Sequence, residues 1–549
     1  MSPGAINGLI RLEDNFASHF EHIADLAPDR TAVAAQDREL TWAQFDEQAD
    51  RLAGYLAARG IGPDDRVALD ARNSPEYLVV LHALYKLMAA PVNVNYRYRA
   101  GEVRYLLEIS GARAVIADDD LAGVVAEAAE SLPGCDLLVR IRPDGGFGPE
   151  VAAADRHPRR PRGDTVWRLF TGGTTGRPKA VLGSHTERLR SVRTGGFATL
   201  GLAGVPEVEA LHQALDIDPY GPRGMVALPA SPLLHGTGLY TALGALAVGA
   251  PVALLPRGRV TGAGLLAAIA RHRVTDLAIV GDAFGLRLLD ALDEAAAAGR
   301  SLGIGSLRRI RSIGSVWTPG VKRRLLEHLD VTLFDTIASA EGGMYARSET
   351  TRATIDHEEG TFELAPGARL LDEDGRDVVP GSEVVGTLAA PVAPGAGYEG
   401  DAEKTAGAFR DIDGVRYTLP GDLATLGADG RLRLLGRGSS VVNTGGEKVF
   451  TDEVELVLRA HPAVRDAVVL GVPDPGFGSA VAAVVSLQAG AQATPDELAA
   501  FVGTRLAGYK KPRRVVVVPE VQRLNTGKAD LGWARRQFGA EAVPAPTAP

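Results

Sequence analysis

The sequence has 549 residues, more than one hydrophobic core normally supports, so we expect at least two domains. Its 45% hydrophobic and 23% charged residues are typical of a globular protein, and the net charge of −9 gives no reason to expect a nucleic-acid partner. The single cysteine, Cys135, excludes an internal disulfide and a cysteine-based metal cluster. Without an apolar run of signal-peptide or membrane-spanning type, we expect a cytoplasmic protein with no membrane span.

The first 165 residues alternate between extended and helical patterns. Apolar runs at 66–70 and 114–117 have the length of strands, and residues 77–84 between them read as a buried helix. This alternation predicts an α/β fold with mostly parallel sheets and helices on both faces. The basic cluster at 156–162 contains prolines and precedes another predicted strand, at 165–170, so we interpret it as a surface loop.

A glycine- and threonine-rich stretch follows that strand, with the sequence Phe170-Thr171-Gly172-Gly173-Thr174-Thr175-Gly176-Arg177-Pro178-Lys179-Ala180. Glycines let a ligand approach the main chain, whose successive amides can form an anion-binding nest. Threonine hydroxyls add donors, and Lys179 supplies a positive charge suited to an oligophosphate. The stretch is not a Walker A motif. It predicts a phosphate-binding loop, the alternative being a solvated turn.

This stretch resembles the phosphate loop of the adenylate-forming superfamily, which includes acyl-CoA synthetases, firefly luciferase and the adenylation domains of peptide synthetases. Segments 73–76 and 91–99 most closely resemble the bacterial acyl-CoA synthetases of the long-chain and steroid type. The resemblance implies use of ATP, with attack on the α-phosphorus and release of pyrophosphate. It gives Thr175 a catalytic role and implies that the nucleotide is held by Thr171, Gly172, Gly173, Thr174, Gly176 and Lys179.

Residues 186–224 are rich in glycine, proline and acidic groups, and we expect irregular structure there. The next segment, 229–238, is similar to the superfamily's P-x-x-H-x-x-G motif. The resemblance places His235 against the acyl pocket and the reacting carboxylate. A histidine satisfied within a turn is the alternative.

A predicted strand at 275–280 leads into the turn 281–284, which in the superfamily lines the substrate pocket, and then into an alanine-rich helix. Segment 312–319 occupies the place of the superfamily's adenine-side S-G-G-A-P motif. The resemblance implies nucleotide contacts at Gly314 and Ser315, while Ile313 departs from the pattern.

Residues 335–342 align with the superfamily motif D-x-Y-G-x-T-E. The resemblance implies nucleotide contacts at Asp335 and Ser339. A carboxylate at Glu341 suits Mg²⁺, a hard cation that takes oxygen ligands and bridges phosphates, and we expect a catalytic role there. Ile337 replaces the aromatic residue that stacks on adenine, and Ala340 replaces a threonine that contacts the α-phosphate.

Segment 417–422 resembles Y-x-T-G-D, which makes Asp422 an acceptor for the ribose hydroxyls. Residues 434–440 are similar to the G-R-x-D-D junction between the large and small domains. Arg437 would contact the ribose, and Ser439 replaces the aspartate around which the small domain turns. The resemblance places Gly445 and Gly446 where the pantetheine arm of coenzyme A enters.

Helix-start signals recur along the chain. Thr41 with Gln44 and Thr494 with Glu497 form predicted capping boxes, the second with a proline at the first helical position. We expect Thr451 to cap a further helix. Strands are predicted at 466–472, 480–487 and 514–518, after which the superfamily's terminal Gly-Lys motif places catalytic Lys528 in the active site.

The predicted organisation is a large adenylation domain over residues 1–436, a small mobile α+β domain over 437–538, and a disordered tail at 539–549. The predicted function is an ATP-dependent ligase that forms an acyl-AMP and transfers the acyl group to coenzyme A, with ATP and Mg²⁺ as the other cofactors. Two alternatives stay open: a relative that uses an amine or activates nitrite, and an inactive ATP-binding relic. The partners are then small molecules, and the oligomeric state is left open, a homodimer included.

Overall fold

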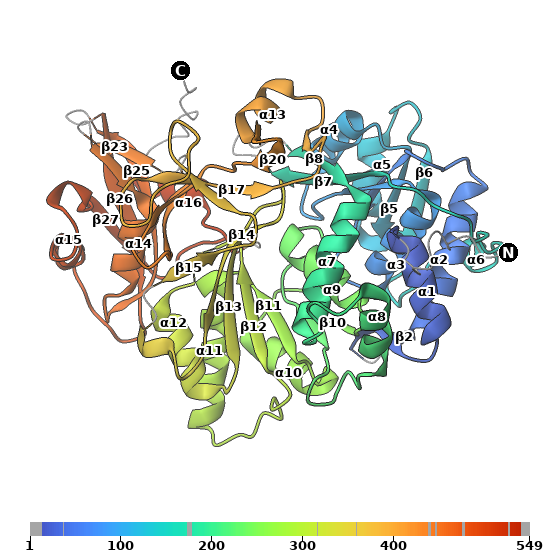
Figure 1. The fold of residues 1–549 in the computed structure, drawn as a ribbon, viewed down its shortest axis with the longest axis horizontal. Coiled ribbons are helices and arrows are strands. Elements are labelled where there is room, and N and C mark those ends of the chain that lie inside the picture. Colours follow the sequence, from blue (N-terminus) through green and yellow to red (C-terminus); the bar gives the residue numbers. More distant parts are fainter. Residues whose placement is uncertain are drawn as a thin grey trace. The chain divides into compact units, whose positions relative to one another are not determined.

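The chain folds into two compact units, and each unit combines separate stretches of sequence. Figure 1 labels the helices and strands along the chain. The computed structural model describes residues 14–36, 38–172, 178–315, 317–357, 360–437, 441–444, 447–474, 478–524 and 527–539. The first unit contains Met1–Ile279, Asp290–Arg311 and Val392–Gly407, and the second contains Val280–Leu289, Ser312–Pro391 and Ala408–Pro549. Three elements contribute to both units: α11 (Gly281–Ala297), β12 (Arg309–Ile313) and α13 (Ala402–Ala408).

A four-stranded parallel sheet of order β4-β3-β5-β6 belongs to the first unit. Its strands are β3 (Arg66–Asp70), β4 (Ala90–Asn93), β5 (Ala114–Asp118) and β6 (Leu137–Ile141). They are connected in turn by α3 (Pro75–Leu87), α4 (Ala100–Ser110) and α5 (Ala122–Ala129), because parallel neighbours require a crossover connection. Helix α3 begins with the Ser74 hydroxyl accepting from the Tyr77 amide, and all its residues are buried. The predicted α/β alternation is confirmed.

A second sheet of the first unit has the order β11-β9-β10-β1-β2, parallel except for the last pair. Its strands are β1 (Thr31–Ala35), β2 (Arg38–Thr41), β9 (Ala227–Pro229), β10 (Val252–Leu254) and β11 (Asp276–Ile279). The other helices of this unit are α1 (Phe16–Leu26), α2 (Trp42–Ala57), α6 (Pro149–Ala152), α7 (His185–Thr199), α8 (Glu207–Asp216), α9 (Gly236–Leu246) and α10 (Gly262–His272).

A small antiparallel sheet of order β18-β8-β7 carries the predicted phosphate loop. Strands β7 (Val166–Gly172) and β8 (Pro178–Ser184) flank that loop, and β18 (Gly397–Tyr398) pairs with β8. The strand predicted before the loop is therefore confirmed.

The second unit contains a mainly antiparallel sheet over residues 332–437. Its order is β13-β14-β15-β22-β21-β17-β20-β19, with β16 paired to β17. The strands are β13 (Thr332–Ala338), β14 (Met344–Thr350), β15 (Thr361–Leu364), β16 (Arg369–Leu371), β17 (Gly386–Pro391), β19 (Phe409–Ile412), β20 (Val415–Thr418), β21 (Asp422–Leu426) and β22 (Leu432–Arg437). Helix α12 (Pro319–His328) precedes β13.

The C-terminal part of the second unit consists of a hairpin, a three-stranded sheet and three helices. The hairpin is β23 (Val441–Thr444) and β24 (Glu447–Phe450), and the sheet is β25 (Val464–Asp474), β26 (Gly478–Leu487) and β27 (Arg514–Val518). The helices are α14 (Thr451–Arg459), α15 (Pro495–Gly503) and α16 (Leu531–Arg536). Valines and leucines of these elements form a buried core.

Three sequence expectations are wrong. Residues 281–284, expected as a turn before a helix, are the first residues of α11. Residues 186–224 are not irregular, because they contain α7 and α8; Ser184 caps α7 by accepting from the Glu187 amide. Thr451 is the first residue of α14 and not its cap, since Phe450 holds that position without a side-chain bond. The capping boxes that start α2 and α15 are confirmed. Among the described residues, none of the helices combines the length and apolar character needed to cross a membrane.

Candidate active site

The two strands beside the phosphate loop bring Thr171 opposite Lys179 and Gly172 opposite Pro178. The predicted ligands Gly173, Thr174, Thr175 and Gly176 lie outside the described residues. The Lys179 ammonium forms an ion pair with Asp401, just before α13, and its hydrogen bond lowers the pKa of that carboxyl group. Lys179 therefore stands at the loop with an acidic partner that an oligophosphate can replace.

Two asparagines tie the first unit's predicted site segments together. The Asn93 side chain donates to the carbonyls of Phe170 at 2.8 Å and Leu234 at 2.9 Å, and accepts from the Phe170 amide at 2.8 Å. The Asn73 carboxamide oxygen accepts from the Leu233 amide at 2.7 Å. The end of β7 is thus held beside the segment before His235. Sequence reasoning noticed both asparagines only as part of the resemblance and missed this positioning role.

His235 occupies the N-cap position of α9 and is half-buried. The turn before it is tight, since a Cβ atom on Gly238 would lie 2.5 Å from the Pro232 carbonyl oxygen. A glycine three residues after the histidine is therefore a steric requirement of this turn. The geometry places the imidazole at the start of a helix whose first turn is partly open.

In the second unit, buried Tyr345 of β14 marks the place where three predicted ligands gather. Its hydroxyl lies 2.9 Å from the Ser339 hydroxyl. Burial raises the pKa of Tyr345, and the nearby carboxylates of Glu341 and Asp422 raise it further. The structure therefore brings Ser339, Glu341 and Asp422 around one side chain. The sequence reading missed Tyr345, for which the only signal was an aromatic residue in a short strand.

Asp422 and Arg437, the two predicted ribose ligands, lie opposite each other at the ends of β21 and β22. Asp422 is mostly buried, with 9% of its surface exposed. Their cross-strand register explains why residues fifteen positions apart could serve one sugar.

The remaining residues predicted to bind the nucleotide are less closely grouped. Gly314 is exposed with a φ of +93°, at the end of β12, and Ser315 is half-buried. Asp335 is buried on β13, with a carboxylate oxygen 3.4 Å from the Lys322 ammonium. Gly445, Gly446 and Ser439 lie outside the described residues, and the roles of all these residues stay predictions.

The segment with Lys528 lies against Val280, the residue between β11 and α11. A Cβ atom on Gly527 would lie 2.9 Å from the Val280 carbonyl oxygen, and Gly527 has a φ of +79°. Arg523 donates to the Gly527 carbonyl at 3.1 Å and forms a double hydrogen bond with Asp466. The structure therefore places the terminal Gly-Lys motif next to the start of the predicted acid pocket.

The start of α11 forms further hydrogen bonds within the second unit. The Gly281 amide donates to the Ser312 hydroxyl at 2.9 Å, and the Asp282 carboxylate accepts from the Thr318 amide at 2.8 Å. Burial raises the pKa of Asp282, although Arg459 lies 3.6 Å away. These contacts hold the first turn of α11 to β12 and to the residue that caps α12.

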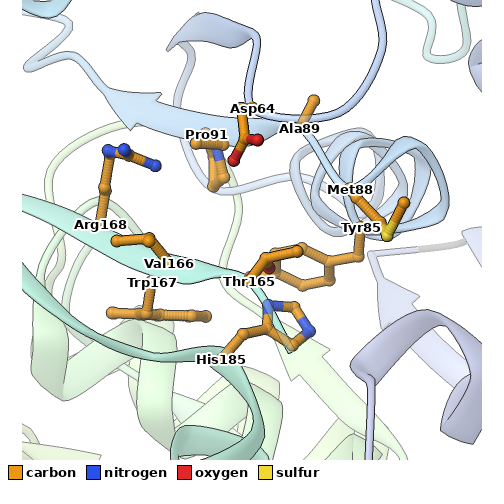
Figure 2. A pocket seen from close by; sticks show the side chains of 11 residues that line it. Asp64, Tyr85, Met88, Ala89, Pro91, Thr165, Val166, Trp167, Arg168 and His185 are labelled. Carbon is orange, nitrogen blue, oxygen red and sulfur yellow. The ribbon is translucent and has the colours of Figure 1, made fainter. Parts of the chain in front are cut away.

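Figure 2 shows a cavity beneath β7, where Trp167, His185 and Tyr85 come together from three elements. Its volume is about 10 Å³, enough for about one water molecule and too small for an acid or a nucleotide. It belongs to the packing behind the phosphate strand and is not the substrate site.

Among the described residues, one group of carboxylates comes close enough to share a cation: Glu21, Asp46 and Asp50. The Lys86 ammonium already lies 2.7 Å from each of them. This group is therefore neutralised by a lysine and is not a metal centre.

The whole chain is similar to known enzymes. A family model described as AMP-binding enzyme matches residues 20–390, and one described as AMP-binding enzyme C-terminal domain matches residues 453–528. A 3-oxocholest-4-en-26-oate–CoA ligase of Rhodococcus rhodochrous is 36% identical over 539 residues, 96% of each chain. A medium/long-chain-fatty-acid–CoA and 3-oxocholest-4-en-26-oate–CoA ligase of Mycobacterium tuberculosis is 36% identical over 97% of each chain.

Solved structures give the same picture. A benzoate CoA ligase from Burkholderia xenovorans superposes with a TM-score of 0.78 at 26% identity, covering 95% of this chain and 99% of that one. An amide bond synthetase from Marinactinospora thermotolerans has a TM-score of 0.75, but its 24% identity establishes only a shared fold. The relatives therefore do not favour the amine-using or nitrite-activating alternatives. The chain belongs to the AMP-binding enzyme family, and its activity is that of an ATP-dependent acid–CoA ligase.

Proposed function

We propose that this ligase activates an organic carboxylic acid, with His235 and Lys528 as catalytic residues. The contact of Gly527 with Val280 carries the proposal, because it brings the terminal Gly-Lys motif to the residue that follows β11. Carboxylate and nucleotide bring like charges together, and a lysine ammonium there offsets them. Its relatives named for fatty-acid and cholestenoate substrates favour an acid with an apolar body.

The proposed nucleotide contacts follow from the predicted set. Thr171 and Lys179, with the loop between them, would hold the phosphates, and Asp422 and Arg437 would bind the ribose. Glu341 would hold Mg²⁺, since its carboxylate supplies the oxygen ligands that this hard cation prefers. The ion would help to neutralise the phosphates, while the side chains position the carboxylate for attack on the α-phosphorus.

The proposed domain boundary lies between residues 436 and 437, at the end of β22. This division would let the small domain turn after adenylate formation, withdraw Lys528 and admit coenzyme A past Gly445 and Gly446. We propose a cytoplasmic location, because Cys135 is a free, buried thiol and a reducing compartment suits such a chain.

The test is ATP-dependent pyrophosphate release across a panel of acids that includes nitrite, with and without coenzyme A and with candidate amines. We expect release to require an organic acid and a thioester to form only with coenzyme A. Product formation only with an amine would contradict the proposed acceptor. Nucleotide binding without any turnover across the panel would favour the relic.

Lys528→Ala tests the catalytic assignment. We expect pyrophosphate release to fall about tenfold to hundredfold, the worth of a hydrogen bond to a charged group, with little change in ATP binding. Exposed Lys511 offers the matched control, and Lys511→Ala should leave the rate unchanged. Equal rates for the two variants would remove Lys528 from the active site.

A further inference from the structure

Helix α7 carries an arginine, Arg188, whose charge has no acidic partner among the described residues. The Arg188 guanidinium lies 4.6 Å from the ring centre of Tyr240 and 6.0 Å from that of Trp167. Within the described part of the chain, these ring contacts are its only interactions with protein groups: it forms no hydrogen bond and no ion pair. A half-buried guanidinium with five unused donors is suited to a planar, two-oxygen anion.

The other arginines of α7 form ion pairs with carboxylates of the protein. Arg190 pairs with Asp14 at 2.6 Å, and buried Arg193 pairs with Glu207 at 2.6 Å. Arg188 is thus the exception on its own helix. Because the chain supplies acids to its neighbours, the missing anion at Arg188 points to a ligand.

The aromatic neighbours of Arg188 also carry unsatisfied polar atoms. The indole Nε1 of Trp167 and the hydroxyl of Tyr240 are both buried and have no hydrogen-bond partner in the part of the chain that the structure describes. Trp167 is only 4% exposed. Buried donors are normally satisfied, so two orphans beside an unpaired cation are an independent sign that a polar group binds here.

Tyr240 connects this place to the proposed acid site. Helices α7 and α9 lie side by side (Figure 1), because a Cβ atom on Gly196 would lie 2.7 Å from the Gly244 carbonyl oxygen. One face of α9 is fully buried. The opposite stripe is half-buried and consists of Thr237, Tyr240, Thr241 and Gly244. This stripe starts at His235, and Tyr240 lies about 7.5 Å further along the helix axis.

A phosphate of the nucleotide is a poorer candidate for the same anion. Trp167 precedes Thr171 by four residues on β7, which separates Arg188's neighbour from the phosphate loop by about 13 Å along an extended strand. Tyr240 lies about 7.5 Å from His235 along α9, whereas Trp167 lies about 13 Å from the phosphate loop along β7. The geometry therefore favours a group that belongs to the acid.

We propose that Arg188 is a specificity-determining residue that binds a second carboxylate of the acid substrate, remote from the carboxylate that is activated. The inference rests on the proposed function, since it places the reacting carboxylate at His235. The preferred substrates are then acids that carry a carboxylate at each end of an apolar body, with Tyr240 and Trp167 packing around the remote group.

The experiment measures kcat/KM for pyrophosphate release with chain-matched pairs: adipic and hexanoic, suberic and octanoic, sebacic and decanoic acid. The wild-type enzyme should prefer the diacid at one chain length or more. Arg188→Gln should lower the ratio of diacid to monoacid by about tenfold to hundredfold, as expected for a lost charged hydrogen bond. Arg188→Lys, which keeps the charge but not the planar fork, should lower it less.

Two further variants serve as matched comparisons. Tyr240→Phe keeps the ring under Arg188 and removes the orphan hydroxyl, so a smaller drop in the same ratio is expected. Arg190→Gln removes a paired arginine from the same helix and should not change the ratio. Thermal unfolding of each variant verifies that it is folded.

The outcomes separate this inference from the function on which it rests. If no acid of either kind supports pyrophosphate release, the proposed function fails and the inference fails with it. If monoacids are activated but the ratio is the same in wild type and Arg188→Gln, only the inference is overturned. If Arg188→Gln raises the KM for ATP and leaves the ratio unchanged, the anion is a phosphate and the inference is also overturned.

Discussion

Each unit of the molecule buries a cation among three carboxylates, and the two clusters differ in how their charges are balanced. In the first unit, the Lys86 ammonium lies 2.7 Å from Glu21, Asp46 and Asp50. In the second unit, guanidinium nitrogens of Arg459 lie between 2.8 and 3.6 Å from three carboxylates: Glu455, Asp466 and Asp282. We call these groups the Lys86 cluster and the Arg459 cluster.

The Lys86 cluster receives extra positive charge from the basic loop at 156–162. Arg156 pairs with Asp50, Arg159 with Asp46 and Arg162 with Glu21. Burial alone would raise the pKa of Asp46, but its hydrogen bond with His82 and the charge of Lys86 outweigh burial and lower it well below the usual range. Asp46 and Glu21, whose pKa values are both lowered, therefore stay ionised at any physiological pH.

The Arg459 cluster has fewer cations for its carboxylates. Burial raises the pKa of Glu455 to about 7, despite the nearby charge of Arg459. Asp466 is better served, since Arg523 binds both its oxygens, and its pKa is lowered against the effect of burial. The Lys86 cluster stabilises the fold through fully compensated charges. The Arg459 cluster contains Glu455, whose pKa lies near neutrality, and is linked through Arg523 to the segment of Lys528.

Lys86→Met should have the largest effect of the variants considered. It leaves three buried carboxylates without their common partner, and breaking a buried ion pair costs about 3–5 kcal/mol. We expect the melting temperature to fall sharply and the yield of folded protein to drop. Arg104→Gln, which removes an exposed helix-surface pair with Glu108, is the control and should shift stability by less than about 0.5 kcal/mol.

Arg459→Met should destabilise the protein less than Lys86→Met. Glu455 can take up a proton near neutral pH and so avoid the cost of an unpaired buried charge. We therefore expect a loss of less than about 3 kcal/mol, the low end of the range for a broken buried ion pair. The two variants are compared by thermal unfolding at the same pH. Equal losses would mean that the clusters are equally dependent on their cations.

Gly527→Ala probes the segment that the Arg459 cluster supports through Arg523. An alanine at a φ of +79° costs about 1–2 kcal/mol, and its Cβ would press on the Val280 carbonyl. If the strain is released by moving Lys528, pyrophosphate release should fall about 5–30-fold. Gly532→Ala, at an exposed position of α16, should leave the rate unchanged. An unchanged rate for Gly527→Ala would separate this backbone from catalysis.

Local chemistry in the sequence was enough to locate part of this structure. The capping boxes at Thr41 and Thr494 depend on residues three positions apart, and both helices begin where the sequence predicts. Strand β27 also has its predicted limits, Arg514–Val518. The strand predicted before the phosphate loop is also present, as β7 (Val166–Gly172).

What the sequence could not supply depends on contacts between distant segments. Helix α7 contains two adjacent glycines and several arginines, so its pattern does not indicate a helix; packing of Gly196 against Gly244 and pairing of Arg193 with Glu207 stabilise it. The unpaired state of Arg188 could be recognised only after that helix was in place. The clusters around Lys86 and Arg459 likewise join residues far apart in the chain.

Glu455→Gln gives the smallest effect and the sharpest distinction between the clusters. A pKa raised from 4.5 to about 7 means that the folded state holds the proton more tightly than the unfolded state. The stability from this proton is complete below about pH 4.5 and is lost as the pH rises through about 7. Between pH 6 and 8 the folded state releases most of this proton. The free energy of unfolding falls by about 1.4 kcal/mol as a result.

Wild type should therefore lose about 1.4 kcal/mol more than Glu455→Gln when the pH rises from 6 to 8, measured as the difference between their unfolding free energies. Glu21→Gln is the control from the Lys86 cluster. The Arg162 and Lys86 contacts lower the pKa of Glu21 against the effect of burial, so its contribution is lost only in acid and is constant over this range. Parallel curves for wild type and Glu455→Gln would show that Glu455, like Glu21, does not change its protonation over this pH range.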